Sequence, residues 1–99
     1  MDVSDYEFKL DWYHNNFVKI QMIKKGIDGA KATGNNQQVE FYQRMGEKAI
    51  AQEIDAYQEG VKAAGGDVEK FLKDMLKNYP DIKNSGQFQT RLYCAGITE

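Results

Sequence analysis

The N-terminal third of this chain carries apolar residues at helical spacing on two sides, and this pattern constrains the fold most. The main stripe consists of Tyr6, Leu10, Tyr13, Phe17, Ile20 and Ile27. Its steps of three and four residues, broken only at Lys24, are typical of one helix face. Phe8, Trp12, Val18 and Met22 fall outside the stripe. A helix with a second apolar face is central in its own bundle or presents that face to a partner.

This pattern predicts a first helix from about residue 5 to residue 25, with an extension as far as residue 32. Gly26 and Gly29 weaken its last turns, because each glycine costs about 1 kcal/mol relative to alanine inside a helix. A Thr-Gly-Asn-Asn cluster at 33–36 then predicts a connection between helices, with Asn36 as the cap of the next one.

A second long helix is predicted over residues 37–64. Its main apolar stripe consists of Ile50, Ile54, Tyr57, Val61 and Ala64. A second line at seven-residue spacing consists of Tyr42, Ala49, Ala56 and Ala63, with Gly46 and Gly60 beside it. Small residues in a line let two helix axes approach closely, so this line is expected to lie against the first helix.

A third helix is predicted over residues 68–78. Gly65 and Gly66 end the preceding helix, Asp67 caps the new one, and Pro80 stops it. Its apolar face consists of Val68, Phe71, Leu72, Met75, Leu76 and Tyr79. The last segment fits a short helix closed by Gly96 or a strand. We favour the helix, because no other segment offers a strand to pair with.

Together these elements predict one all-α domain over residues 1–99. Its architecture is a small bundle in which a long antiparallel helical hairpin is joined by a third amphipathic helix and a short C-terminal segment. The formal net charge of −2 gives no general attraction to nucleic acid or anionic membranes. A single cysteine and the lack of 18 consecutive apolar residues favour a cytoplasmic protein without a membrane span.

Catalytic and metal-binding patterns are weak. Asp11 and His14 are three residues apart, which is the spacing of half of a di-iron helical motif. The second motif with a His is missing from the sequence. A solvated polar flank of the helix is therefore the better interpretation. Cys94 lies in an apolar stretch and is interpreted as a buried or half-buried structural thiol. We therefore expect a protein that is not an enzyme and that has no cofactor and no metal.

The leading hypothesis is a non-enzymatic protein-binding module, a small adaptor or inhibitor that occupies a surface of a larger protein partner. The predicted interface residues are Phe8, Trp12, Met22, Phe41 and Met45. Trp and other aromatic residues are favoured anchors of protein interfaces. A phage or mobile-element protein that inhibits a host enzyme or defence complex is one setting for this function.

Two alternatives remain open. The first is a small nucleic-acid-binding regulator that uses a basic face of the third helix and the tail. Its residues would be Lys70, Lys73, Lys77, Lys83 and Arg91. The second is a structural homo-oligomer, in which the second apolar face of the first helix forms a homodimer seam.

Overall fold

Four α-helices and one 3-10 helix follow one another along residues 3–97, which the computed structural model describes, with side chains described from residue 5. The helices are α1 (Val3–Ala32), α2 (Asn36–Ala63), α3 (Val68–Asn78), η1 (Pro80–Asn84) and α4 (Gly86–Cys94). Between residues 3 and 97 there is no strand, and the predicted all-α class is confirmed. The C-terminal segment adopts the helix that the sequence favours.

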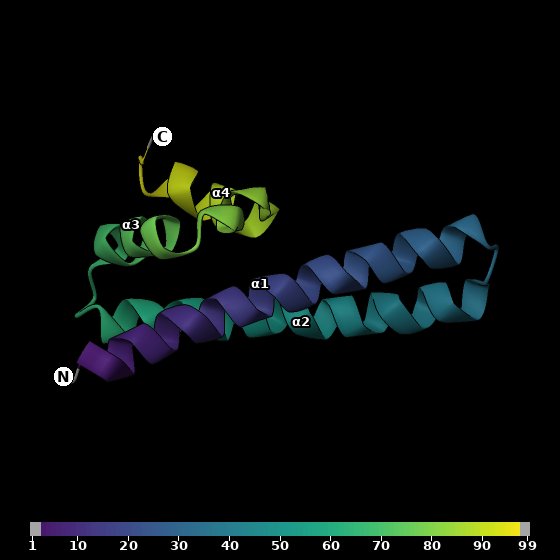
Figure 1. The fold of residues 1–99 in the computed structure, drawn as a ribbon, viewed down its shortest axis with the longest axis horizontal. Helices are drawn as coiled ribbons and strands as arrows, with labels where there is room; N and C mark the ends of the chain where they lie inside the picture. The colour runs from purple at the N-terminus through teal and green to yellow at the C-terminus, as the bar shows by residue number, and fades with distance from the viewer. Residues whose placement is uncertain (1–2, 98–99) are drawn as a thin grey trace.

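Helices α1 and α2 form the predicted long antiparallel hairpin (Figure 1). Helix α1 continues to Ala32, and Gly26 and Gly29 both lie inside it. Gly34 takes a positive φ of 70° in the turn. The cap of α2 is Asn35 and not the expected Asn36, since the Asn35 side chain accepts a hydrogen bond of 3.1 Å from the Gln38 N–H.

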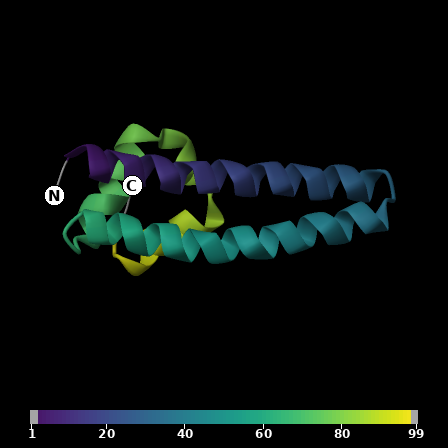
Figure 2. The ribbon, with the colours of Figure 1, turned by 90° about the horizontal axis from the view of Figure 1, so that it is seen from below.

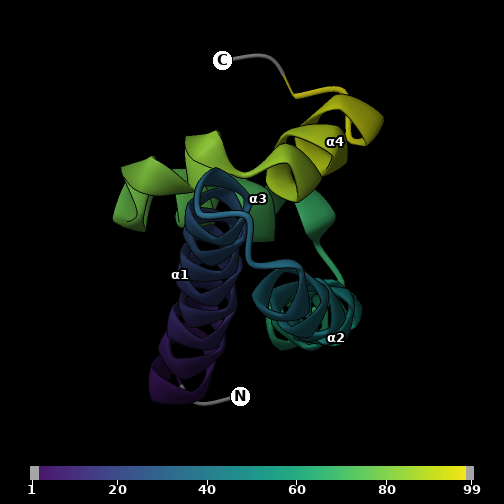
Figure 3. The same ribbon diagram turned by 90° about the vertical axis from the view of Figure 1, so that its right-hand side faces the viewer.

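The chain then folds back over one face of the hairpin. Asp67 caps α3 as predicted, by accepting from the Lys70 N–H at 3.0 Å. Pro80 ends that helix and begins η1, and Ser85 caps α4. Seen along the hairpin, α3, η1 and α4 form a second layer above α1 and α2 (Figure 3).

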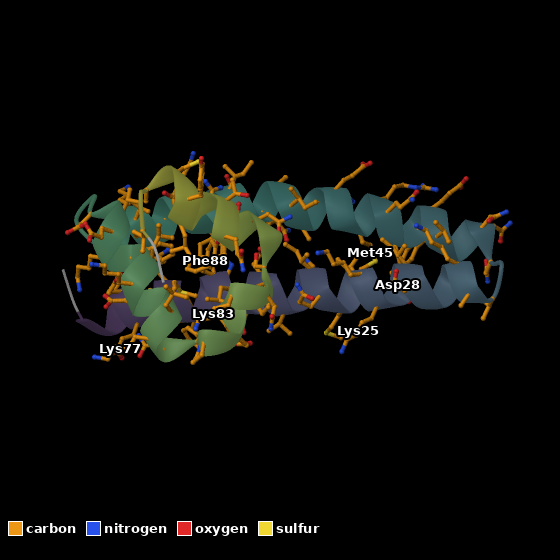
Figure 4. The ribbon with its side chains drawn as sticks, turned by 90° about the horizontal axis from the view of Figure 1, so that it is seen from above. Lys25, Asp28, Met45, Lys77, Lys83 and Phe88 are labelled. Carbon is orange, nitrogen blue, oxygen red and sulfur yellow. The ribbon has the colours of Figure 1, made fainter. Side chains whose placement is uncertain are left out.

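The main core lies where this second layer meets the hairpin. Its largest fully buried side chains come from four elements: Tyr13 from α1, Phe71, Leu72 and Met75 from α3, Ile82 from η1 and Phe88 from α4. In the view from above, Phe88 lies over the seam between the two hairpin helices (Figure 4). Helix α2 contributes small residues at this point, because the Phe71 ring lies directly on Gly60.

The other end of the hairpin has no second layer. We call residues 20–49 the hairpin arm; it extends away from α3 and α4 (Figure 2). A smaller core of Ile20, Ile23 and Ala49 lies between its two helices. The molecule therefore measures 47 × 27 × 19 Å, and its radius of gyration is 15.0 Å. A compact domain of this size has about 13 Å.

Two predictions about burial were wrong. Ile50 and Ile54, expected in the main stripe of α2, are exposed, whereas the small residues Ala49 and Ala56 are fully buried. The small residues face α1, and the C-terminal helices do not extend over Ile50 and Ile54. Cys94 is also exposed, because Phe88 and Leu92 supply the buried side of α4.

Replacing Gly60 with alanine tests the close approach of α3 to α2. The added Cβ would lie 2.2 Å from the Phe71 ring, so Gly60→Ala should lower the free energy of unfolding by about 1–3 kcal/mol. Gly29→Ala is the matched control: its Cβ would meet nothing within 4 Å, and it should gain about 1 kcal/mol of helix propensity. Urea denaturation measures both. Two variants that shift stability in the same direction would contradict this packing.

Candidate functional site

A buried carboxylate joins three helices at the centre of the molecule. Glu53 of α2 is only 4% exposed. Its Oε2 accepts hydrogen bonds from the Tyr13 hydroxyl of α1 and from the Arg91 Nε of α4, the latter at 2.9 Å. Its Oε1 accepts from Arg91 Nη2 at 2.7 Å. A two-point arginine–carboxylate pair of this kind is strong and directional.

Neighbouring rings complete this cluster. The Arg91 guanidinium lies 3.8 Å from the centre of the Tyr57 ring, where its positive charge meets the electron-rich ring face. Burial raises the pKa of the Tyr13 hydroxyl, and its hydrogen bond to Glu53 raises it further, so Tyr13 remains a donor. The Glu53 hydrogen bond likewise raises the pKa of Arg91. Each polar group has a structural partner, and we interpret this cluster as a clamp for α4.

His14 has a structural environment of its own. Its Nε2 lies 2.8 Å from an Asp81 carboxylate oxygen, and its ring stacks on Tyr79 with centroids 4.3 Å apart. These contacts connect α1 to η1. Asp11 lies beside the same group, where it accepts a hydrogen bond of 3.3 Å from the Tyr79 hydroxyl. Among the described residues, no three acidic, histidine or cysteine side chains are arranged to hold a metal ion.

Among the residues that the structure describes, none covers the second apolar side of α1, whose large side chains are exposed. The exposed fractions are 68% for Phe8, 40% for Trp12, 67% for Met22 and 59% for Phe41. Met45 is half-buried against the small core of the hairpin arm, and Figure 4 shows it between the two helices. Met45 therefore belongs more to the core than to the predicted interface.

These residues do not form a single patch. Phe8 and Trp12 are one turn apart near the start of α1, whereas Met22 lies fourteen residues beyond Phe8, roughly 21 Å along the helix. Phe41 lies near the tip of the arm, with its ring edge-on to Tyr42. Two pairs of predicted interface residues are one helical turn apart, Phe8 with Trp12 on α1 and Phe41 with Met45 on α2. Only the first pair is exposed at both positions.

Two open grooves meet at Trp12. One is lined within α1 by Phe8, Lys9, Asp11, Trp12 and Asn15. The other runs between the hairpin helices and is lined by Trp12, Asn15, Asn16 and Lys19 of α1 and by Gln52 and Asp55 of α2. We call the second one the Trp12 groove. Neither groove includes a residue of α3, η1 or α4, so this surface is separate from the layer that covers the core.

The five residues of the predicted basic face are not brought together. Arg91 is turned inward to Glu53, so its inclusion in that face was wrong. Lys70 pairs with Asp74 at 2.9 Å and Lys73 with Glu69 at 2.6 Å. Lys77 and Lys83 lie on α3 and η1 (Figure 4). Carboxylates beside these lysines reduce the positive field that phosphate contacts need.

Sequence reasoning missed Glu53, Arg91 and the polar lining of the Trp12 groove. One indication was present: Glu53 falls three residues after Ile50 and four before Tyr57, among the apolar positions of α2. Comparison of the chain with known protein families, with curated proteins and with solved structures finds no significant match. Across residues 3–97, no helix has the length and apolar character needed to cross a membrane.

Arg91→Met should destabilise the fold by about 3–5 kcal/mol, because it leaves the Glu53 carboxylate buried without its cation. The double variant Glu53→Leu/Arg91→Met should recover part of this loss, since no buried charge remains, but the buried Tyr13 hydroxyl then lacks its acceptor. Lys73→Met is a control that removes an exposed ion pair, and it should change stability by less than about 1 kcal/mol. Urea denaturation at neutral pH compares the three. A double variant as unstable as Arg91→Met would show that the charge is not the cause.

Proposed function

We propose that this chain is a non-enzymatic protein-binding module, a small adaptor or inhibitor that acts by occupying a surface of a larger protein. The exposed pair of Phe8 and Trp12 on α1 carries this proposal. Both side chains are large and apolar, and no residue of α3, η1 or α4 lines the grooves beside them. Exposed aromatic residues next to shallow grooves are typical of interface anchors.

The polar groups of the interior support the same proposal. The buried carboxylate of Glu53 is saturated by Tyr13 and Arg91, and His14 is held between Asp81 and Tyr79. These groups hold helices together, whereas catalysis would require polar groups directed at a substrate. The exposed Cys94 lies at the last residue of α4.

The hairpin arm supplies a second argument. Its core comes from its two helices alone, and Met22 and Phe41 are left exposed along it. A chain of this size gains stability from a second layer over a helical pair. Here that layer reaches only the base of the arm, where Gln87 of α4 lines a groove with Ile20 and Ile23. A partner that covers the arm as well as Phe8 would bury a surface of the size that stable complexes need.

Site-specific photo-crosslinking tests the proposal. A benzoylphenylalanine replaces Phe8 in one variant and Tyr93 in the control, and both are expressed in the organism that encodes the chain. Tyr93 is a suitable control because it is an aromatic residue that is 85% exposed on α4. We expect position 8 to give one discrete product with a larger protein, identified by mass spectrometry, and position 93 to give none.

Other outcomes of this experiment count against the proposal. A product of twice the chain mass from position 8 would favour the homo-oligomer and argue against a larger partner. Equal patterns from positions 8 and 93 would show non-specific contact. The absence of any product from position 8 in a folded variant would contradict a protein-binding role for this surface.

A further inference from the structure

A buried acceptor without a partner lies in the lining of the Trp12 groove. Asn16 is 7% exposed, and its Nδ2 donates a hydrogen bond of 3.1 Å to the Ala49 carbonyl. Its Oδ1 is buried and accepts no hydrogen bond. Leaving such an acceptor unsatisfied costs roughly 1–3 kcal/mol. Because Oδ1 has almost no exposed surface, a donor from the groove satisfies it only when the Asn16 side chain turns toward the groove that it lines.

The groove also holds an unpaired negative charge. Asp55 of α2 is exposed and forms no ion pair or hydrogen bond with the described residues. Lys19 is the cation that lines the same groove, and its Nζ donates to Gln52 Oε1 at 3.0 Å. Lys19 and Gln52 still hold unused donors, and the acceptors left open in the groove are Asn16 Oδ1 and the Asp55 carboxylate.

Trp12 adds an aromatic platform beside these acceptors. The Lys9 ammonium lies 5.0 Å from the centre of the Trp12 ring while it also pairs with Glu59 at 3.5 Å. The fold thus already places one cation against this indole, as expected from the negative face of its π system. The ring is 40% exposed, so it offers further surface to the groove.

We infer that the Trp12 groove binds an arginine side chain of a protein partner. A guanidinium is flat, stacks on aromatic rings and carries five N–H donors with no acceptor. It would stack on Trp12, pair with the Asp55 carboxylate and donate to Asn16 Oδ1. A lysine ammonium is a compact charge that does not stack in this way, and a neutral group lacks the attraction to Asp55. This inference rests on the proposed protein-binding function and specifies the chemistry of its partner.

Titration of the isolated protein by NMR tests this assignment. The probe is N-acetyl-arginine amide, and the readouts are the Trp12 indole N–H and the Asn16 side-chain amide resonances. We expect saturable shifts of both. N-acetyl-citrulline amide, which has nearly the same shape without the charge, should bind at least about tenfold more weakly, because charge-assisted hydrogen bonds are about twice as strong as neutral ones.

Two matched variants separate the groove from general electrostatics. Asp55→Asn should weaken arginine binding roughly threefold to tenfold. Asp28→Asn changes the net charge equally but lies on α1 outside the groove, so it should leave binding unchanged. Both positions are exposed, and equal thermal midpoints will confirm that both variants fold. Shifts that do not saturate, equal binding of citrulline, or equal effects of the two variants would overturn the assignment.

The two proposals can fail separately. If crosslinking from position 8 identifies a partner and arginine does not bind, the groove assignment is wrong and the protein-binding function stands. If arginine binds in the groove and position 8 gives no product, the function as a protein-binding module is contradicted.

Discussion

The buried carboxylate of Glu53 is the interaction on which the arrangement of this molecule depends. A carboxylate at this depth is tolerated only with strong partners, because its desolvation costs several kcal/mol. Tyr13 supplies one hydrogen bond from α1, and Arg91 supplies two from α4. Helix α4 must therefore lie where Arg91 reaches Glu53. Phe88 and Leu92 of the same helix then enter the core, which also receives Phe71 from α3.

The position of this clamp divides the hairpin into two unequal parts. At one end, α3, η1 and α4 cover a core with fully buried aromatic rings. At the other end, the core of the arm comes from α1 and α2 alone. Their close contact depends on small residues. At Gly26, for example, an added Cβ would lie 2.8 Å from the Tyr42 ring, which is too close for any side chain larger than that of glycine. Between residues 3 and 97 no further element covers the arm, so Met22 and Phe41 are exposed there, as are Phe8 and Trp12 near the start of α1.

The sequence predicted the helices well, since their signals are local. Residues 68–78 were placed without error, because Asp67 and Pro80 mark both ends of that helix. The line of small residues on α2 was correctly assigned to the contact with α1 at Gly46 and Ala49, whereas Gly60 lies against Phe71 of α3. The exposure of Ile50 and Ile54 was not predictable in this way. Periodicity shows that a face is apolar, but whether another element covers it depends on the path of the chain.

The same limit explains the polar residues of the sites. Glu53 is one of many charged residues of α2, and its burial depends on Arg91, 38 positions later. Arg91 was assigned to a basic surface because its neighbours in sequence suggested one. The Trp12 groove combines Asn16 with Asp55 from the other helix, and no local pattern connects them. Trp12 itself was identified, because an aromatic residue outside the main stripe of a helix is visible in the sequence.

Native-state hydrogen exchange tests the division of the hairpin most directly. The covered end and the arm are compared within each helix: Tyr13 with Ile23 on α1, and Ala56 with Met45 on α2. Amides of Tyr13 and Ala56 should exchange only through global unfolding, whereas those of Ile23 and Met45 should exchange through an opening of lower free energy, because few buried contacts hold the arm. Equal free energies of exchange along both helices would contradict this account.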